Sequence, residues 1–592
     1  MTETRQCQNC RLPFVIDQED STFYEQMQVP PPTWCPRCRM RRRMLFRNER
    51  MLYKIICRLC GKSVISMYPA DTPYTVYCFD CWNSDRWDPL AYGRDCDFSE
   101  PFFEQFNEFL RTVPRPSVEG SQNVNCPYTN YTWESKNCYL TNSTLFCENC
   151  FYAKGLERCK DCSDCYQIAE TELCYECVAC HHCSRSSFLF HSKECVDCSF
   201  LYNCVNCQNC FMSANLRNKK FVFEGTQCTS KEEYLSNLAE RRLDTHIGTE
   251  QAITQFDDLR HASLHKYAHI DKCVNSSGDV IYNTKNIRSC FNAHDLENVR
   301  YAVRGYNVKD IRDTYGFDDE QWCYENINDG LFSSYIRFCT NTHTNCLDVR
   351  FCDYCRSSSY LFACISIRSK SYCIFNKQYT REGYEPLVAK IIQHMAEQPY
   401  RDSKGRSFAY GEFWPPALSP FGYNETAAQE YFPITEAQAA AEGFKWKHPE
   451  SRHYEVTLQP GALKEIDVVG DDILNEVIGC EHSGMCGHQC TTAFRFIPGE
   501  LQFYRRMKLP LPRRCPNCRH AERMTRINPV ELWHRKCECE GRTSEVKGQH
   551  VITNTATHVH GTAACTNEFE TSYAPDRPEI VYCESCYNAE VV

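Results

Sequence analysis

The sequence lacks two features that would direct the chain out of the cytoplasm. No run approaches the roughly 18 apolar residues of a membrane span, and the stretch from Met1 to Cys7 has no apolar core of a secretory signal. Both absences predict a cytoplasmic protein with no membrane partner. In that reducing compartment, the 45 cysteines are expected to be metal ligands or small buried side chains rather than disulfides.

Sequence signatures of common enzymes are also missing. There is no phosphate-binding glycine loop, no Gly-x-Ser-x-Gly elbow and no His-Glu-x-x-His helix. A His-x-Glu placed before a paired-cysteine knuckle, as in zinc deaminases, is not found at a usable spacing. The sequence therefore predicts a protein that is not an enzyme and that has no evident small-molecule substrate.

Positive charge is scarce overall but concentrated near the two ends. The net charge of −10 argues against general nucleic-acid binding. Residues 1–60 carry a balance of +5 and residues 501–536 a balance of +8, which leaves −23 for the remainder. Two basic patches therefore flank an acidic body.

Paired cysteines mark the N-terminal part of the chain. They are Cys7 and Cys10, Cys35 and Cys38, Cys57 and Cys60, and Cys78 and Cys81. Each Cys-x-x-Cys turn delivers two thiolates, and two such turns complete a tetrahedral zinc site. Two zinc ions are predicted here.

The C-terminal part repeats this pattern at a constant offset, so that Cys10 corresponds to Cys490 and Cys35 to Cys515. The predicted ligands are Cys486, Cys490, Cys515, Cys518, Cys537, Cys539, Cys583 and Cys586. Cys480 or His482 competes with Cys486 for the first of these ions, and His558, His560 and Cys565 are candidates for a further site. The predicted total is about four zinc ions per chain.

Arginines follow the second knuckle at each end. The predicted nucleic-acid contacts are Arg37, Arg39, Arg41, Arg42, Arg43, Arg47, Arg505, Arg506, Arg513, Arg514, Arg519 and Arg523. A helix starting at the knuckle is typical of treble-clef modules, and guanidinium groups bind phosphate through paired hydrogen bonds. Structured RNA, including ribosomal RNA, is one expected partner. A solvated helix face or a patch for an acidic protein is the alternative.

The body of the chain is duplicated at a spacing of about 150 residues. Asp164 corresponds to Asp313, and the triplet Cys174-Tyr175-Glu176 to Cys323-Tyr324-Glu325. In the second copy Val308, Ile311, Val349 and Leu361 replace Cys159, Cys162, Cys198 and Cys210. Such replacements predict that these cysteines are core residues.

Short strands separated by polar turns predict a mainly β fold with short helices. The body is expected to be a duplicated β-solenoid or parallel β-helix, flanked at both ends by paired treble-clef or zinc-ribbon modules. One compact sandwich per half is the alternative. Thr229-x-x-Glu232 and Thr435-x-x-Gln438 predict helix starts.

Five domains are predicted in chain order. They are zinc ribbons at 1–95, a first solenoid half with a capping helix at 120–245, a second at 265–398, a proline- and aromatic-rich strap at 399–476, and zinc ribbons at 480–592. The strap cannot be regular helix, because Trp414-Pro415-Pro416 and Tyr431-Phe432-Pro433 remove backbone donors.

The strap motifs and the Cys-Pro-x-Cys-Arg knuckles resemble those of uncharacterised large, cysteine-rich zinc-ribbon proteins of candidate-phylum bacteria with reduced genomes. The resemblance spans nearly the whole chain. It implies zinc at the terminal knuckles and carries no activity. Cys537-x-Cys539 and the histidine-containing insertion depart from the pattern.

Three functions are compatible with these features. The first is a zinc-binding scaffold whose terminal ribbons bind structured RNA. The second is a protein-interaction hub with the acidic solenoid as the docking surface. The third is thiol redox or metal-buffering chemistry, for which Cys174, Cys177, Cys180 and Cys183 are the best local candidates.

Overall fold

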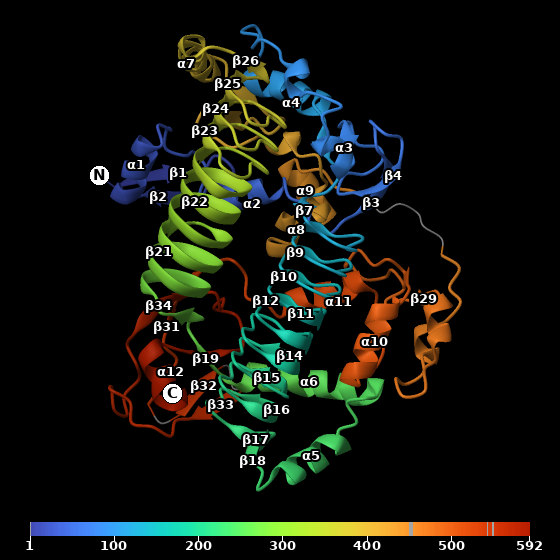
Figure 1. The fold of residues 1–592 in the computed structure, drawn as a ribbon. Coiled ribbons are helices and arrows are strands. Elements are labelled where there is room, and N and C mark those ends of the chain that lie inside the picture. Colours follow the sequence, from blue (N-terminus) through green and yellow to red (C-terminus); the bar gives the residue numbers. More distant parts are fainter. Residues whose placement is uncertain (1, 449–453, 542, 547–549) are drawn as a thin grey trace. The chain divides into compact units, whose positions relative to one another are not determined.

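The chain forms two compact units in a computed structural model that describes residues 2–448, 454–541, 543–546 and 550–592 (Figure 1). Unit 1 comprises Met1–Glu119 and Ile270–His448, and unit 2 comprises Gly120–His269 and Pro449–Val592. Each unit therefore joins one terminal part of the chain to the body copy that is more distant in sequence. No helix in the described ranges is long and apolar enough to cross a membrane.

The body copy in unit 2 is a stack of backbone coils, here called the first coil stack. Its strands are β7 (Gly120–Ser121), β8 (Asn130–Trp133), β9 (Asn142–Leu145), β10 (Lys154–Glu157), β11 (Lys160–Ser163), β12 (Tyr166–Ala169), β13 (Glu172–Tyr175), β14 (Ser184–Phe190), β15 (Ser199–Tyr202), β16 (Gln208–Ala214), β17 (Lys220–Phe223) and β18 (Thr226–Gln227). Lys154 pairs in parallel with Asn142 on one side and Tyr166 on the other. The chain thus returns to the same position after each coil of 12 residues.

A three-residue repeat within each coil explains this path. Asp161 and Asp164 have φ of 52° and 54°, and positive φ recurs at every third residue from Gln122 to Glu224. Asn and Asp adopt this left-handed conformation more readily than most residues. From Thr132 to Ser213, the residue after each left-handed position is buried inside the coil.

Cysteine fills many of these inward positions. The Cys162 thiol lies 3.3 Å from the carbonyl oxygen of Lys160 and 3.6 Å from that of Thr171, and neighbouring cysteines repeat the arrangement. A small side chain with a weak donor suits an interior lined by backbone carbonyls. The Cys-x-x-Cys spacing in the body therefore arises from the three-residue repeat.

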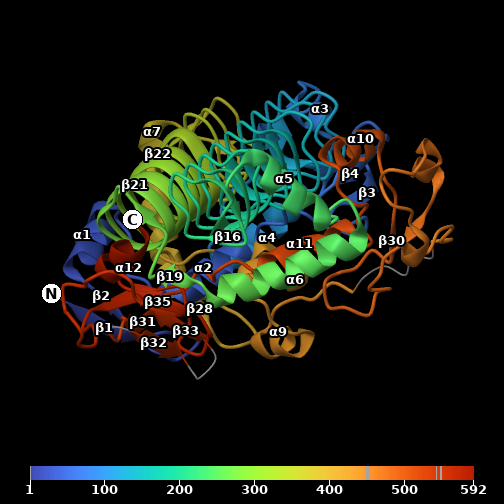
Figure 2. The same cartoon turned by 90° about the horizontal axis from the view of Figure 1, so that it is seen from below.

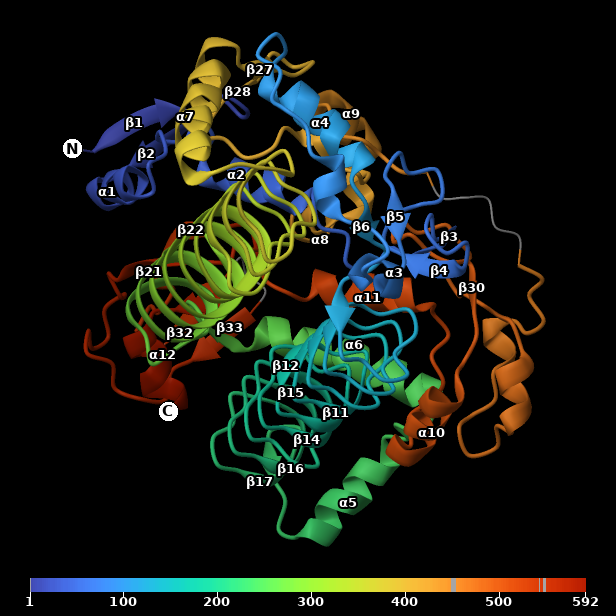
Figure 3. The ribbon, with the colours of Figure 1, turned by 45° about the horizontal axis from the view of Figure 1, so that its top comes forward.

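The second coil stack, in unit 1, has the same architecture (Figure 3). Its strands are β20 (Ile270–Asp271), β21 (Val274–Arg300), β22 (Val303–Arg337), β23 (Leu347–Arg350), β24 (Ser359–Phe362), β25 (Ser371–Ile374) and β26 (Lys377–Gln378). Val308, Ile311, Val349 and Leu361 are all buried in its interior. The prediction that these positions are core residues is confirmed.

Helices pack beside the two coil stacks. The helix α5 (Lys231–Glu240) contacts β17, and α7 (Arg381–Glu397) contacts β25. The α5 cap lies one residue later than predicted, because the Ser230 hydroxyl accepts the Glu233 N–H while the Glu233 carboxylate accepts from Thr229. The predicted strand-rich fold with short helices is confirmed.

Other helices join segments within each unit. The helices α4 (Phe102–Thr112) and α6 (His246–Ala262) precede the two coil stacks, and each leads into a short strand, β6 (Arg115–Pro116) or β19 (Leu264–Lys266). In unit 2, α6 lies beside α11 (Pro516–Thr525), as Figure 2 shows.

The proline- and aromatic-rich stretch packs in unit 1 as far as His448. It contains β27 (Tyr400–Arg401), β28 (Ser407–Phe408), the short 3-10 helices Pro416–Leu418 and Tyr423–Glu425, α8 (Ala427–Tyr431) and α9 (Glu436–Glu442). Trp414 is buried and its indole N–H donates to the Phe338 carbonyl of the second coil stack at 2.7 Å. The predicted capping box of Thr435 and Gln438 is confirmed.

Candidate metal centres

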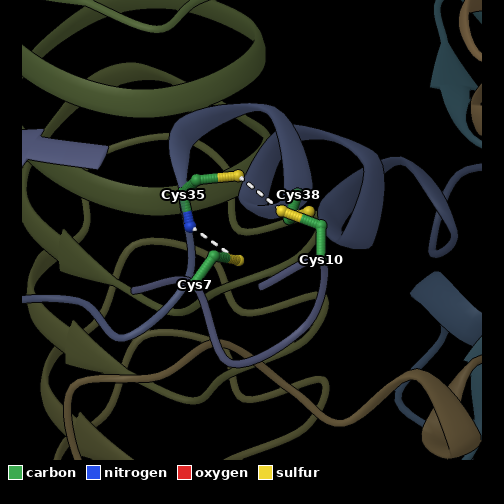
Figure 4. A group of neighbouring side chains, drawn as sticks. All are labelled: Cys7, Cys10, Cys35 and Cys38. Atoms are coloured by element: carbon green, nitrogen blue, oxygen red, sulfur yellow. Dashed lines mark hydrogen bonds between the residues drawn. The ribbon is translucent and has the colours of Figure 1, made fainter. Parts of the chain in front are cut away.

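The first N-terminal centre collects four cysteines from a turn and a helix start (Figure 4). Cys7 and Cys10 lie between β1 (Glu3–Gln6) and β2 (Pro13–Ile16). Cys35 caps α2 (Pro36–Met44), and Cys38 lies in its first turn. The Sγ atoms of Cys10 and Cys35 are 3.7 Å apart.

The second N-terminal centre repeats this construction. Cys57 and Cys60 lie between β3 (Tyr53–Ile56) and β4 (Ser63–Ser66). Cys78 follows β5 (Val76–Tyr77) and caps α3 (Phe79–Asn83), which carries Cys81. The Sγ atoms of Cys60 and Cys78 are 3.9 Å apart.

These sulfur separations suit a tetrahedral ion. Zn–S bonds of about 2.3 Å at tetrahedral angles place the sulfurs about 3.8 Å apart. The sulfur separations in the C-terminal centres agree, with 3.9 Å between Cys490 and Cys515 and 3.9 Å between Cys565 and Cys583. In each of the four groups all ligand atoms lie within 4.8 Å of one another.

Two backbone hydrogen bonds identify the first ligand of each centre. In the first centre the Cys7 N–H donates at 2.9 Å to the carbonyl oxygen of Leu12, which lies two residues after the second ligand, Cys10. The N–H of the third ligand, Cys35, donates to the Cys7 sulfur at 3.2 Å. The same pair of bonds occurs in the second centre, from Cys57 and from Cys78.

These bonds correct the ligand set of the first C-terminal centre. The N–H of Cys480 donates to Thr492, two residues after Cys490, and its sulfur accepts from the N–H of Cys515. Cys480 follows β29 (Ile478–Gly479) as Cys7 follows β1. The centre is therefore Cys480, Cys490, Cys515 and Cys518. Cys480, the predicted competitor of Cys486, thus takes the first position, while Cys486 lies in the loop between the first two ligands and forms a second group with His482, His488 and Cys518.

The last centre differs from the prediction in the same way. The strands β31 (Trp533–Lys536) and β34 (Glu568–Thr571) pair antiparallel and bring Cys537 beside Cys565. The N–H of Cys537 donates to Asn567, two residues after Cys565. The centre is Cys537, Cys565, Cys583 and Cys586. Cys539 was predicted as the second ligand, but its spacing from Cys537 is too short for the knuckle, and the insertion supplies Cys565 instead.

Local donors favour a thiolate at Cys57 and at Cys583. Each third ligand caps a helix, whose N-terminal dipole attracts negative charge. Burial raises the pKa of Cys57, but backbone N–H donation, first from Cys78, outweighs it and lowers that pKa to about 6. Burial likewise opposes ionisation of Cys583, and the Ser585 hydroxyl and other donors lower its pKa to about 6.

Three arginines of α2, Arg39, Arg42 and Arg43, are buried against the second coil stack. Arg39 pairs with Asp313 at 2.8 Å, and Arg43 lies 3.3 Å from the same carboxylate and 3.1 Å from Glu325. Arg42 pairs with Glu325 at 2.9 Å. All five side chains are at most 1% exposed.

The C-terminal copy builds the same network on the first coil stack. On α11, Arg519 lies 3.1 Å from Asp164, and Arg523 lies 3.0 Å from Asp164 and 2.5 Å from Glu176. Asp164 and Glu176 are the duplicates of Asp313 and Glu325. The duplication therefore preserves the pairs of Arg39 and Arg43, whereas Glu522 stands at the position that corresponds to Arg42.

In unit 2, three buried carboxyl groups, those of Asp164, Glu176 and Glu500, share two buried arginines, Arg519 and Arg523. Burial, opposed by Arg523, raises the pKa of Glu176 to about 7. Burial also raises the pKa of Glu500 to about 7, against the charge of Arg519. Glu500 accepts from the Tyr152 hydroxyl at 2.8 Å. The carboxyls of Glu176 and Glu500 thus titrate near neutral pH.

Five of the arginines predicted to contact nucleic acid are closed to phosphate, whereas Arg37, Arg505 and Arg506 have exposed side chains. Arg39, Arg42, Arg43, Arg519 and Arg523 are buried in the ion pairs described above. Five of the other arginines pair with carboxylates: Arg41 with Glu442, Arg47 with Glu49, Arg505 with Asp471, Arg506 with Asp161, and Arg514 with Glu250, Glu481 and Glu522. The guanidinium group of Arg37 lies over the Phe432 ring, and Arg513 is half-buried. Buried guanidinium groups require carboxylate partners, and the body of each unit supplies them.

Comparison with models of known protein families gives no match, and comparison with curated proteins gives none either. Several cysteine groups can hold metal ions, which is consistent with a metal-binding scaffold.

Proposed function

We propose that the chain is a non-enzymatic scaffold in which four zinc ions fix arginine-bearing modules onto two β-solenoids. One observation carries the proposal: four cysteine groups share the same backbone hydrogen bonds and sulfur separations near those of a zinc tetrahedron. The two coil stacks are the proposed solenoids.

Four thiolates favour a structural rather than a catalytic ion. A catalytic zinc keeps a coordination position for water or substrate, whereas four cysteines close the site. Zinc is the proposed metal because thiolates at this spacing suit its size and its preference for tetrahedral sulfur coordination.

The metal centres also explain how the arginines are positioned. Cys35 and Cys38 lie at the start of α2, and Arg39 follows directly. Fixing this end of the helix directs Arg39 and Arg43 at Asp313. The ion is therefore expected to stabilise the whole module-and-stack unit, because the module brings the charges that neutralise the buried carboxylates.

Docking of a protein partner is a second candidate function. A groove of about 740 Å³ in unit 2 lies between the first coil stack and α10 (Pro498–Met507). A ladder of amide hydrogen bonds runs from Asn125 through Asn137 and Asn149 to Asp161 along one wall. Phe151 and Phe503 add apolar surface. Asn137→Arg should abolish co-purification of a partner that binds there, and an unchanged partner would contradict this candidate.

Metal analysis of matched variants tests the scaffold. Cys35→Ser should lower the zinc content of the purified chain by one ion and destabilise unit 1. Cys159→Val is the matched control, because its duplicate is Val308, and it should leave the zinc content unchanged. Protein that folds without metal, or a loss of zinc in the Cys159→Val variant, would overturn the proposal.

A further inference from the structure

Each C-terminal module carries an insertion between its first and second ligands. Cys7 and Cys10 enclose two residues, whereas Cys480 and Cys490 enclose nine. The longer loop contains His482, Cys486 and His488. The insertion of the last module, between Cys537 and Cys565, contains Cys539, His558 and His560. The first insertion therefore adds one cysteine and two histidines, and the second adds one cysteine and three histidines, of which His558 and His560 lie nearest to Cys565 in the sequence.

The first insertion directs these groups at the fourth ligand of its own centre. One ligand atom from each of His482, Cys486, His488 and Cys518 lies within 4.8 Å of the others. The Sγ atoms of Cys486 and Cys518 are 3.6 Å apart, close to the separation of about 3.8 Å for two sulfurs on one zinc ion.

Two imidazole nitrogens at this position lack a protein partner. Nδ1 of His482 and Nδ1 of His488 are inaccessible to solvent and make no hydrogen bond within the part of the chain that the structure describes. A buried polar atom without a partner is costly, and a bound ion would remove that cost. The other nitrogen of His482 lies 3.7 Å from Glu522, as in carboxylate–histidine–zinc arrangements.

In the last module a different loop also supplies one cysteine and two histidines, and one of these histidines lies beside the fourth ligand of the centre. His560 Nε2 lies 3.2 Å from the sulfur of Cys586, and His558 Nδ1 lies 3.4 Å from the sulfur of Cys539. Sulfur and nitrogen ligands of one tetrahedral zinc ion are about 3.5 Å apart.

Both histidines of the last module are already oriented. His558 Nε2 lies 2.8 Å from the Glu590 carboxylate, and His560 Nδ1 lies 2.7 Å from the Ala563 carbonyl oxygen. Such contacts hold the outer nitrogen of a metal-binding histidine and leave the inner nitrogen as a neutral ligand. The inner nitrogens are those that face Cys539 and Cys586.

The N-terminal centres provide a contrast within the same chain. Their fourth ligands accept hydrogen bonds from side chains that are not metal ligands: Asn9 donates to Cys38 at 3.3 Å and Arg86 to Cys81 at 2.6 Å. At Cys518 and Cys586 the corresponding neighbours are cysteine and histidine. The difference in chemistry is confined to the modules with insertions.

We propose that each C-terminal module binds a second zinc ion, held by the insertion's cysteine and two histidines and bridged to the first ion by Cys518 or Cys586. A thiolate shared by two zinc ions also lowers the net negative charge of the sulfur ligands, and so lowers their mutual repulsion. Two divalent ions among five thiolates leave one negative charge uncompensated, compared with two for one ion among four thiolates. The inference goes beyond the four-ion scaffold, which does not require it.

Native mass spectrometry of the full chain, saturated with zinc and then desalted, counts the ions. Six ions are expected, two more than the four cysteine groups alone provide. Replacing His482 and His488 together by Ala should leave five, as should the corresponding replacement of His558 and His560. A total of four overturns the proposal, and a total of five overturns it for the module whose histidine variant leaves the count unchanged.

Cadmium NMR tests the bridge without any substitution. In the chain loaded with ¹¹³Cd, scalar coupling between two cadmium resonances is expected in each C-terminal module, because a shared sulfur connects the ions. The N-terminal ions should give uncoupled resonances. Six uncoupled resonances would overturn the bridging role of Cys518 and Cys586.

Discussion

Replacing Arg523 tests whether the helix arginines stabilise the fold. Arg523 is 1% exposed and lies 3.0 Å from Asp164 and 2.5 Å from Glu176. Removing one partner of a buried ion pair typically costs about 3–5 kcal/mol, because the remaining charge is uncompensated. Arg523→Met, which keeps most of the apolar stem, should therefore lower the free energy of unfolding of unit 2 by about that amount at pH 8.

The cost should depend on pH with a definite sign. Burial raises the pKa of Glu176 to about 7 in the folded chain while Arg523 opposes the rise. Without Arg523 the folded pKa rises further, so Glu176 binds a proton and the penalty is smaller near pH 5 than at pH 8. The variant's stability should fall more steeply than that of the wild type as pH increases through this range.

Urea unfolding followed by circular dichroism measures these differences, and an exposed pair on the same coil stack provides the control. Arg185 and Asp197 are 2.7 Å apart, but their side chains are 54% and 36% exposed. Arg185→Met should cost at most about 1 kcal/mol. Equal costs for the two variants, or an Arg523→Met variant that is stable but has lost RNA binding, would refute the structural role of Arg523.

Three further predictions concern the core, a buried carboxyl and the metal. Cys159→Val with Cys162→Ile should change the free energy of unfolding by less than about 1.5 kcal/mol in urea titrations, because Val and Ile occupy the duplicate positions; a much larger loss would show that the thiols are specifically required. Burial raises the pKa of Glu500 from 4.5 to about 7, so its contribution to stability is present below pH 4.5 and is lost as pH rises to about 7. Glu500→Gln should remove this dependence and stabilise unit 2 at pH 8 by up to about 3 kcal/mol in the same titrations, whereas an unchanged pH profile would contradict it. Chelation at neutral pH should expose Trp34 and Trp82, buried beside the N-terminal centres, and shift their fluorescence to longer wavelength; unchanged emission after metal removal would argue against a structural ion.

The same cysteine spacing has two physical causes in this chain, and the sequence could separate them only in part. In the terminal modules it arises from a knuckle that places two thiols in one candidate metal centre. In the coil stacks it arises from inward positions at every third residue, as at Cys174 and Cys177. The duplicate positions revealed the second cause, because Val308 and Ile311 cannot bind metal. The three-residue backbone repeat needed the structure, since residues as different as Asp161 and Phe188 adopt the same left-handed conformation.

The arginines could not be placed from the sequence because their partners are remote. Asp313 lies 274 residues after Arg39, and Asp164 lies 355 residues before Arg519. A cluster of arginines on a short helix looks the same whether it faces water or buried carboxylates. Insertions likewise prevented the sequence from identifying two of the candidate metal ligands. The backbone hydrogen bonds that identify Cys480 and Cys565 depend on the pairing of β29 with β30 (Ala493–Phe494) and of β31 with β34.

The duplication involves a terminal module and a coil stack together. In unit 1 the rings of Tyr24 and Tyr324 are 5.3 Å apart, and in unit 2 those of Tyr504 and Tyr175 are 5.8 Å apart. The ion pairs follow the same correspondence. Since the N-terminal module packs on the second coil stack and the C-terminal module on the first, neither module is an appendage to a finished body. Each supplies positive charge to the buried carboxylates of its stack, so the candidate metal centres and the packing of the two stacks are parts of one structure.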